Sequence, residues 1–217
     1  MRKLIVFSAV IIVLLLLLKR KDMTLRQSIL KTIYPLIMLK GKFFSSKKAI
    51  QENTTGIVPP VSFYSLSAVN NAGDTVQFSS FKGKKVMIVN TASDCGYTAQ
   101  YEELETVYRQ NKDHLIILAF PANDFKEQEK KDDAAIASFC KINYGISFPL
   151  MKKSHVVKGN EQHAVFQWLT DPLRNGWCVQ EPLWNFSKYI INEEGVLTHF
   201  YSQEVSPLGK EVISAIR

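Results

Sequence analysis

The chain has 217 residues, 46% of them hydrophobic, and a formal net charge of +7. This length suits one globular domain with an appendage. Residues 1–50 hold 11 Lys or Arg and one acid, which is +10, whereas residues 51–217 hold 16 Lys or Arg and 19 Asp or Glu, which is −3. Because the part expected to fold is mildly acidic, the sequence does not indicate DNA or RNA binding, and we expect no nucleic-acid partner.

Residues 1–22 have the pattern of a transmembrane signal-anchor. An apolar run, residues 4–18, has two cations directly before it and three cations directly after it. A helix of this length spans about 22 Å, short of the roughly 30 Å hydrocarbon core, so a cleaved signal peptide and a buried hydrophobic helix are alternatives. A triple cation follows the run in place of a cleavage site, which favours an uncleaved single-pass membrane anchor. The larger number of cations after the run predicts that the C-terminal domain is cytoplasmic.

Residues 23–60 are predicted to form a basic juxtamembrane helix and a linker. Apolar residues in 24–44 recur near helical spacing among lysines. A helix lying on the membrane surface and a helix packed on the domain fit this pattern equally, and Pro35 would kink either one. Residues 45–60 are polar and end in Pro59-Pro60, which is typical of a linker.

Residues 61–217 are predicted to form one α/β domain. Turn residues 70–74 between two short apolar segments predict an N-terminal β-hairpin. Strands alternating with helices then indicate a central mixed β-sheet flanked by helices. The expected strands are 85–90, 114–120, 188–192 and 196–201, and the expected helices are 98–111, 132–144, 161–170 and a last one, capped by Ser206, to Arg217.

Cys95 lies between the strand 85–90 and the helix expected from residue 98. Backbone N–H groups and the positive end of a helix dipole at this place favour the thiolate, which is the nucleophilic form of a cysteine. The alternative, from position alone, is a buried structural cysteine.

Three motifs surround this cysteine and follow it. They are GKKVMIVNTASDCGYT at 83–98, FPANDFKEQE at 120–129 and WNFSKYIINEEG at 184–195. In this order and spacing they closely resemble the motifs of the glutathione peroxidases, over about residues 61–215. The resemblance implies a thioredoxin-like fold and the reduction of hydrogen peroxide and organic hydroperoxides. It implies a catalytic group made of Cys95, Gln128, Trp184 and Asn185.

The chemistry of these side chains suits that role. An indole N–H and two amides donate hydrogen bonds without ionising near neutral pH, so they stabilise a thiolate and assist the departing oxygen. The second motif departs from the family's usual FPCNQFGxQE, because Ala122, Asp124 and Lys126 stand for Cys, Gln and Gly. Asp124 near the site would raise the pKa of Cys95, Lys126 would offset this effect, and the lost glycine puts the conformation of the loop in question.

Cys140 matches the resolving cysteine of the thioredoxin-dependent branch of the family. In this branch a sulfenic acid at Cys95 becomes a Cys95–Cys140 disulfide, which thioredoxin or a similar dithiol reduces. Glutathione is the less favoured reductant, because basic residues for its carboxylates are not evident. A buried helix-face cysteine is the alternative for Cys140. Cys178 has no clear counterpart and is a bystander or a backup resolving residue.

The remaining observations limit the function further. The cysteine and histidine spacing indicates no metal site, and we expect no cofactor. Residues 95–98 read CGYT, which excludes a CxxC disulfide oxidoreductase. The sequence therefore predicts a thiol peroxidase, and the alternative is a membrane-tethered peroxide sensor that passes its oxidation to a partner protein.

Overall fold

The computed structural model describes residues 22–44 and 49–217. The predicted anchor run, residues 4–18, lies outside these described residues. Within the two described ranges, no helix has the length and hydropathy of a membrane span.

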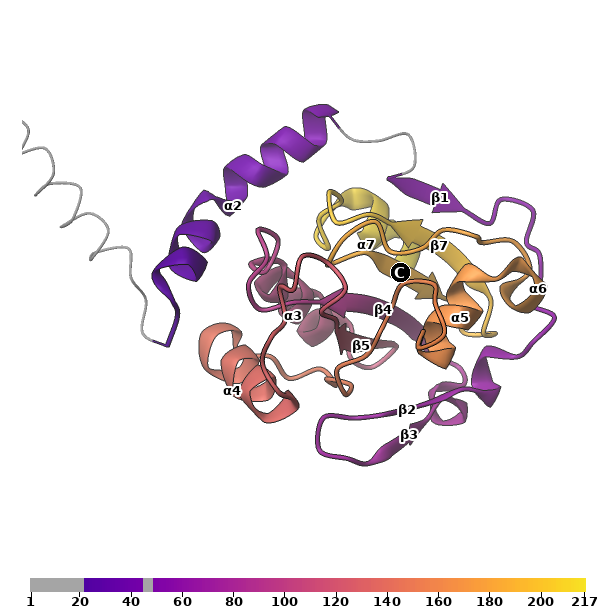
Figure 1. The fold of residues 1–217 in the computed structure, drawn as a ribbon. Helices are drawn as coiled ribbons and strands as arrows, with labels where there is room; N and C mark the ends of the chain where they lie inside the picture. The colour runs from indigo at the N-terminus through magenta and orange to yellow at the C-terminus, as the bar shows by residue number, and fades with distance from the viewer. Residues whose placement is uncertain (1–21, 45–48) are drawn as a thin grey trace, which may run out of the picture.

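A five-stranded mixed sheet forms the centre of the domain, with strand order β1-β7-β6-β4-β5 (Figure 1). Strands β4 and β5, at one end of this order, are parallel, and the other neighbours are antiparallel. A separate hairpin of β2 and β3 precedes β4, as the turn residues predict. The strands are β1 (Ile50–Glu52), β2 (Ser67–Val69), β3 (Thr75–Gln77), β4 (Lys85–Thr91), β5 (Leu115–Pro121), β6 (Lys188–Ile191) and β7 (Leu197–Tyr201).

The two faces of the sheet each carry a hydrophobic core. Along β4, Met87 and Val89 belong to one core, whereas Val86 and Ile88 belong to the other. This alternation follows from the period of two in a strand. The first core contains residues of α3 (Gln100–Asn111), α4 (Asp133–Tyr144) and α7 (Lys210–Ile216), and the second contains residues of α5 (Ala164–Thr170), which the short α6 (Pro172–Asn175) follows.

The ends of α4 have clear local causes, whereas the predicted cap of the last helix is wrong. Asp132 accepts a hydrogen bond from Ala135 N–H at 2.8 Å, and α4 ends at Gly145, whose φ is 62°. In contrast, Gly209 is the N-cap of α7, and the Ser206 hydroxyl instead donates to Glu103. A tertiary hydrogen bond therefore uses the side chain that the sequence assigns to the cap.

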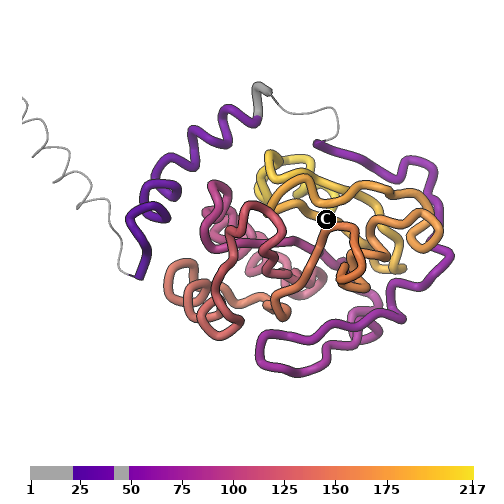
Figure 2. The backbone as a smooth tube through the Cα atoms, viewed as in Figure 1, coloured from indigo at the N-terminus to yellow at the C-terminus, as the bar shows by residue number. Residues whose placement is uncertain are grey.

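Helix α2 (Leu25–Phe44) packs on the domain, which decides between the two alternatives that the sequence left open in favour of packing. Met23 belongs to the first core, and Tyr34 is buried. Figure 2 shows α2 along one flank of the molecule. The helix continues through Pro35. The prediction that residues 45–60 form a linker is wrong at Ile50–Glu52, because these residues form strand β1 and pair with β7.

Candidate active site

Cys95 lies in the turn that joins β4 to α3, and its side chain is only 1% exposed. Its backbone N–H donates to Thr98 Oγ1 at 3.0 Å, which holds the turn, and Tyr97 N–H donates to Cys95 Sγ at 3.4 Å. Turn residues 96–99 separate the cysteine from the start of α3 at Gln100. The backbone donor to the sulfur is therefore the Tyr97 amide, and the helix begins later than expected.

The other three predicted side chains come together beside this turn. Asn185 Nδ2 donates to Gln128 Oε1 at 3.1 Å, and Asp94 N–H donates to the Gln128 carbonyl at 3.1 Å. Gln128 is thus tied to both the Cys95 turn and Asn185. The ring of Trp184 packs against Phe125 with centroids 5.4 Å apart. Three loops distant in sequence therefore meet at one thiol.

The ionisation of Cys95 differs from the expectation. Burial raises the pKa of Cys95 to about 11, although the Tyr97 amide, Trp184, Asn185 and Arg26 all act to lower it. The donors favour the thiolate as expected, but the loss of hydration outweighs them. At neutral pH the resting group is therefore the thiol, and its proton must leave as sulfur attacks.

Asn90 joins the first motif to the third. Its Nδ2 donates to the Trp184 carbonyl at 3.1 Å, and its Oδ1 accepts from Ser187 N–H at 3.1 Å. Both contacts hold the loop that presents Trp184 and Asn185. Asn90 stands in the quoted motif, but its side-chain role was not apparent from the sequence, because nothing local identifies its partners.

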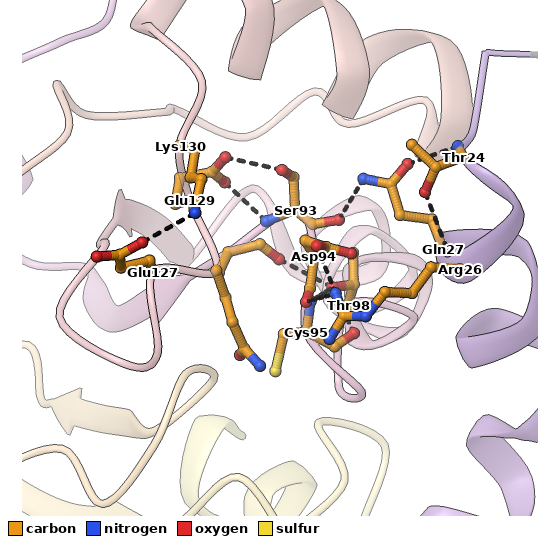
Figure 3. A network of polar contacts seen from close by, with 12 residues as sticks. Thr24, Arg26, Gln27, Ser93, Asp94, Cys95, Thr98, Glu127, Glu129 and Lys130 are labelled. Carbon is orange, nitrogen blue, oxygen red and sulfur yellow. Dashed lines mark hydrogen bonds and ion pairs between the residues drawn. The ribbon is translucent and has the colours of Figure 1, made fainter.

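Glu129 and Ser93 form a second buried contact, between the first and second motifs (Figure 3). Ser93 donates to the Glu129 carboxylate from both its N–H and its Oγ, each at 2.7 Å. Lys131 Nζ donates to the same Oγ at 2.7 Å. Burial raises the pKa of Glu129, while the Ser93 and Lys131 contacts lower it. Sequence reasoning missed both residues, although Glu129 ends the second motif.

Comparison with known proteins shows the family to which a chain with this geometry belongs. The family model for glutathione peroxidase matches residues 63–170. A glutathione peroxidase-like peroxiredoxin of Saccharomyces cerevisiae is 41% identical over 146 residues, which are 67% of this chain and 89% of the yeast protein. The chain belongs to the glutathione peroxidase family.

Two further relatives agree with this assignment. A glutathione peroxidase of Lactococcus lactis is 39% identical over 68% of this chain and 93% of its own length. The crystal structure of Trgpx in its apo form is 32% identical, with a TM-score of 0.56 over 72% of this chain and 96% of that chain. The family and the thioredoxin-like fold that the sequence predicts are therefore confirmed.

The departures from the family's usual second motif have structural consequences. Lys126 and Glu127 have φ of 52° and 51°, so the position where the family usually has glycine is left-handed in this chain. Asp124 accepts from Val156 N–H at 2.9 Å and pairs with His155 at 2.9 Å. It is not among the groups that shift the pKa of Cys95. The expected effect of Asp124 is therefore wrong, because its carboxylate is already paired with His155.

Lys126 and Ala122 also have defined surroundings. Lys126 Nζ lies 5.7 Å from the centroid of the Trp184 ring, so its charge faces an aromatic ring of the site. It too is not among the groups that shift the pKa of Cys95. Ala122, where the family usually has cysteine, is fully buried in the second core.

The two other cysteines lie on opposite faces of the sheet. Cys140 in α4 belongs to the same core as Cys95, whereas Cys178 belongs to the other core. All three are free and buried. Burial raises the pKa of Cys140 to about 12 and that of Cys178 to about 11. Cys140 is thus the one that shares the Cys95 side of the sheet.

Residues able to hold a metal do not cluster in the described part of the chain, where no group of three His, Cys, Asp or Glu side chains has suitable geometry.

Proposed function

We propose that the protein is a thiol peroxidase that reduces hydrogen peroxide and organic hydroperoxides through Cys95. The observation that supports this most is the Cys95 thiol beside Trp184 and Asn185, with Gln128 hydrogen-bonded to Asn185, in a member of this family. Side-chain amide and indole donors beside a thiol are what stabilises negative charge on sulfur and on a departing oxygen.

The reaction balances with the groups present. The Cys95 sulfur attacks one oxygen of ROOH, the O–O bond breaks, and the second oxygen leaves as RO⁻. The thiol proton ends on RO⁻, so the products are the Cys95 sulfenic acid and ROH. Because the resting group is a thiol with a raised pKa, proton transfer to the leaving oxygen accompanies the attack.

The second half of the cycle uses Cys140. Its thiol attacks the Cys95 sulfenic acid, giving a Cys95–Cys140 disulfide and water. A dithiol protein such as thioredoxin then reduces this disulfide and is itself oxidised. Two observations support this: both residues belong to one core, and several relatives are named peroxiredoxins. Because Cys140 is fully buried in α4, we expect the end of that helix to unwind during the step.

Cysteine variants test both halves. Cys95→Ser is expected to lose peroxide consumption, because a serine alkoxide does not form at neutral pH. Cys140→Ser is expected to consume one equivalent of peroxide, stop at the sulfenic acid and lose thioredoxin-supported turnover. Cys178→Ser is the matched control and is expected to retain turnover. Substantial activity in Cys95→Ser, or a Cys95–Cys178 crosslink by mass spectrometry, would contradict the proposal.

The alternative of a peroxide sensor gains no support from the relatives, which are named as peroxidases and peroxiredoxins. Multiple turnover with thioredoxin, thioredoxin reductase and NADPH separates the two functions. The same assay with glutathione identifies the preferred reductant.

We also propose, from the sequence, that residues 1–22 anchor the protein in a membrane with the catalytic domain in the cytoplasm. The apolar run between clusters of cations supports this proposal. Full-length protein is expected to stay in the membrane pellet after a carbonate wash. Its release, or an N-terminus newly generated near residue 20, would contradict the anchor.

A further inference from the structure

Helix α2, which precedes the family match at 63–170, contacts the loop that carries Cys95 (Figure 3). Arg26 Nη1 donates to the Asp94 carbonyl at 2.8 Å and forms an ion pair with the Asp94 carboxylate. Gln27 Nε2 donates to the Ser93 carbonyl at 2.9 Å. Two consecutive residues of α2 thus hold the two residues that directly precede Cys95.

The first turn of α2 is itself held in place. Gln27 N–H donates to Thr24 Oγ1 at 3.2 Å, and Thr24 N–H donates to Gln27 Oε1 at 2.9 Å, so the residues cap the helix reciprocally. About three turns further along α2, Ile37 Cδ1 would lie 3.3 Å from a Cβ atom at Gly96. The helix therefore contacts the Cys95 loop on both sides of the cysteine.

The charge of Arg26 has a specific use at this place. Asp94 carries a carboxylate directly before the residue that must become an anion, and an unpaired carboxylate there would oppose the thiolate. Arginine keeps its positive charge over the whole accessible pH range and pairs well with a carboxylate. The Arg26–Asp94 pair is about half exposed, so its contribution to stability is small.

We propose that Arg26 is a positioning residue for Cys95, which neutralises Asp94 and holds the loop so that the thiolate forms more readily; this inference rests on the proposed peroxidase function. It assigns a part of the active site to a helix that precedes the matched family region. Consistent with this, Arg26 is the cation that lowers the pKa of Cys95, against the larger effect of burial.

Apart from Arg26 and Asp94 themselves, the charged and titratable groups near the thiol are the same in every variant below. Asp94 and Tyr97 belong to the Cys95 loop itself. Lys130, from the Gln128 loop, interacts with Asp94, and Glu204, from the C-terminal segment, interacts with Tyr97. A difference between Arg26 variants therefore reports on Arg26 and its pair with Asp94.

The test is the pH profile of Cys95 alkylation by iodoacetamide, located by mass spectrometry of the Cys95 peptide. Arg26→Gln is expected to shift the midpoint of the profile upward by about 0.5 unit, which is about a threefold lower rate below the midpoint. Arg26→Lys is expected to restore most of the shift, because it keeps the charge. Lys40→Gln removes a cation of the same helix that has no contact with the loop and is the matched control.

A double variant keeps the proposal falsifiable if Arg26→Gln loosens the fold. Arg26→Gln/Asp94→Asn is expected to return toward the wild-type midpoint, because the carboxylate that Arg26 neutralises is gone. An unshifted Arg26→Gln profile, or uniform slowing that neither Arg26→Lys nor the double variant corrects, would overturn the proposal. Alkylation needs no peroxide turnover, so a wild-type protein that failed to reduce peroxide would contradict the proposed function alone.

Discussion

Two neighbouring residues before Gln128 adopt a backbone conformation that side chains disfavour. Lys126 and Glu127 both have positive φ, at 52° and 51°. A non-glycine residue there costs roughly 1–2 kcal/mol, and such strain persists only where the surroundings impose it. The Lys126 amine over Trp184 and the Glu127–Lys130 ion pair at 2.9 Å accompany this loop conformation. Lys126 and Glu127 directly precede Gln128, whose side chain accepts a hydrogen bond from Asn185.

Lys126→Gly is expected to raise the free energy of unfolding by about 1 kcal/mol, because glycine adopts positive φ without a steric cost. Lys126→Ala is the control, since it removes the amine but keeps the Cβ atom, and it is expected to give no gain. Urea denaturation measures both. Equal stability of the two variants would show that the amine contact, and not the backbone, decides.

Helix α2 also contacts the end of α4, the helix that carries Cys140. Lys31 Nζ pairs with Glu102 at 2.5 Å, donates to the Asn143 carbonyl at 3.4 Å and lies 4.2 Å from the centroid of the Tyr144 ring. The last two contacts lie within the final turn of α4. The unwinding of this turn that the proposed disulfide step requires would break both contacts, so we expect α2 to oppose that step.

Lys31→Met is therefore expected to speed the conversion of the sulfenic acid to the disulfide several-fold, since about 1 kcal/mol is a factor of about five. The first reaction with peroxide is expected to keep its rate. Rapid quenching followed by mass spectrometry measures both steps, and Lys40→Met on the same helix is the control. A disulfide rate equal to that of the wild type would show that the end of α4 moves without displacing α2.

At the scale of the whole molecule, one buried lysine joins the sheet to α3 and to the C-terminal segment. Lys188 Nζ donates to Gln100 Oε1 at 2.9 Å and to the Val205 carbonyl at 2.7 Å. Burial lowers the pKa of Lys188 to about 7 from its ordinary 10.5, against the attraction of Glu103. The Lys188 amine is thus fully buried between β6, the start of α3 and the C-terminal segment.

The stability of the fold should depend on pH through this lysine. Between pH 7 and about 10.5, the unfolded chain binds a proton at Lys188 that the folded protein does not. Wild-type stability relative to Lys188→Met is therefore expected to rise with pH over this window, at no more than about 1.4 kcal/mol per pH unit, and to stay level below pH 7. Urea denaturation from pH 6 to pH 10 measures it. A difference that stays constant with pH would contradict the burial of a neutral amine.

The sequence by itself determined the type and order of nearly all the elements, and its family motifs named the candidate residues of the site. Strands β4 and β5 are continuous apolar runs, and the hairpin has turn residues between two short segments, so local patterns suffice there. The three family motifs named Cys95, Gln128, Trp184 and Asn185, which the structure brings together. The errors at Ser206 and at the start of α3 concern element ends, which depend on one or two hydrogen bonds.

Only the tertiary structure decided what surrounds the site. Arg26 and Asp94 are 68 positions apart, and no local period relates them. The pairing of Asp124 with His155 and the raised pKa of Cys95 likewise depend on contacts and burial that a sequence pattern does not contain. Side-chain chemistry and periodicity are local properties of a chain, whereas loss of water and the choice of partner are set when distant segments pack together.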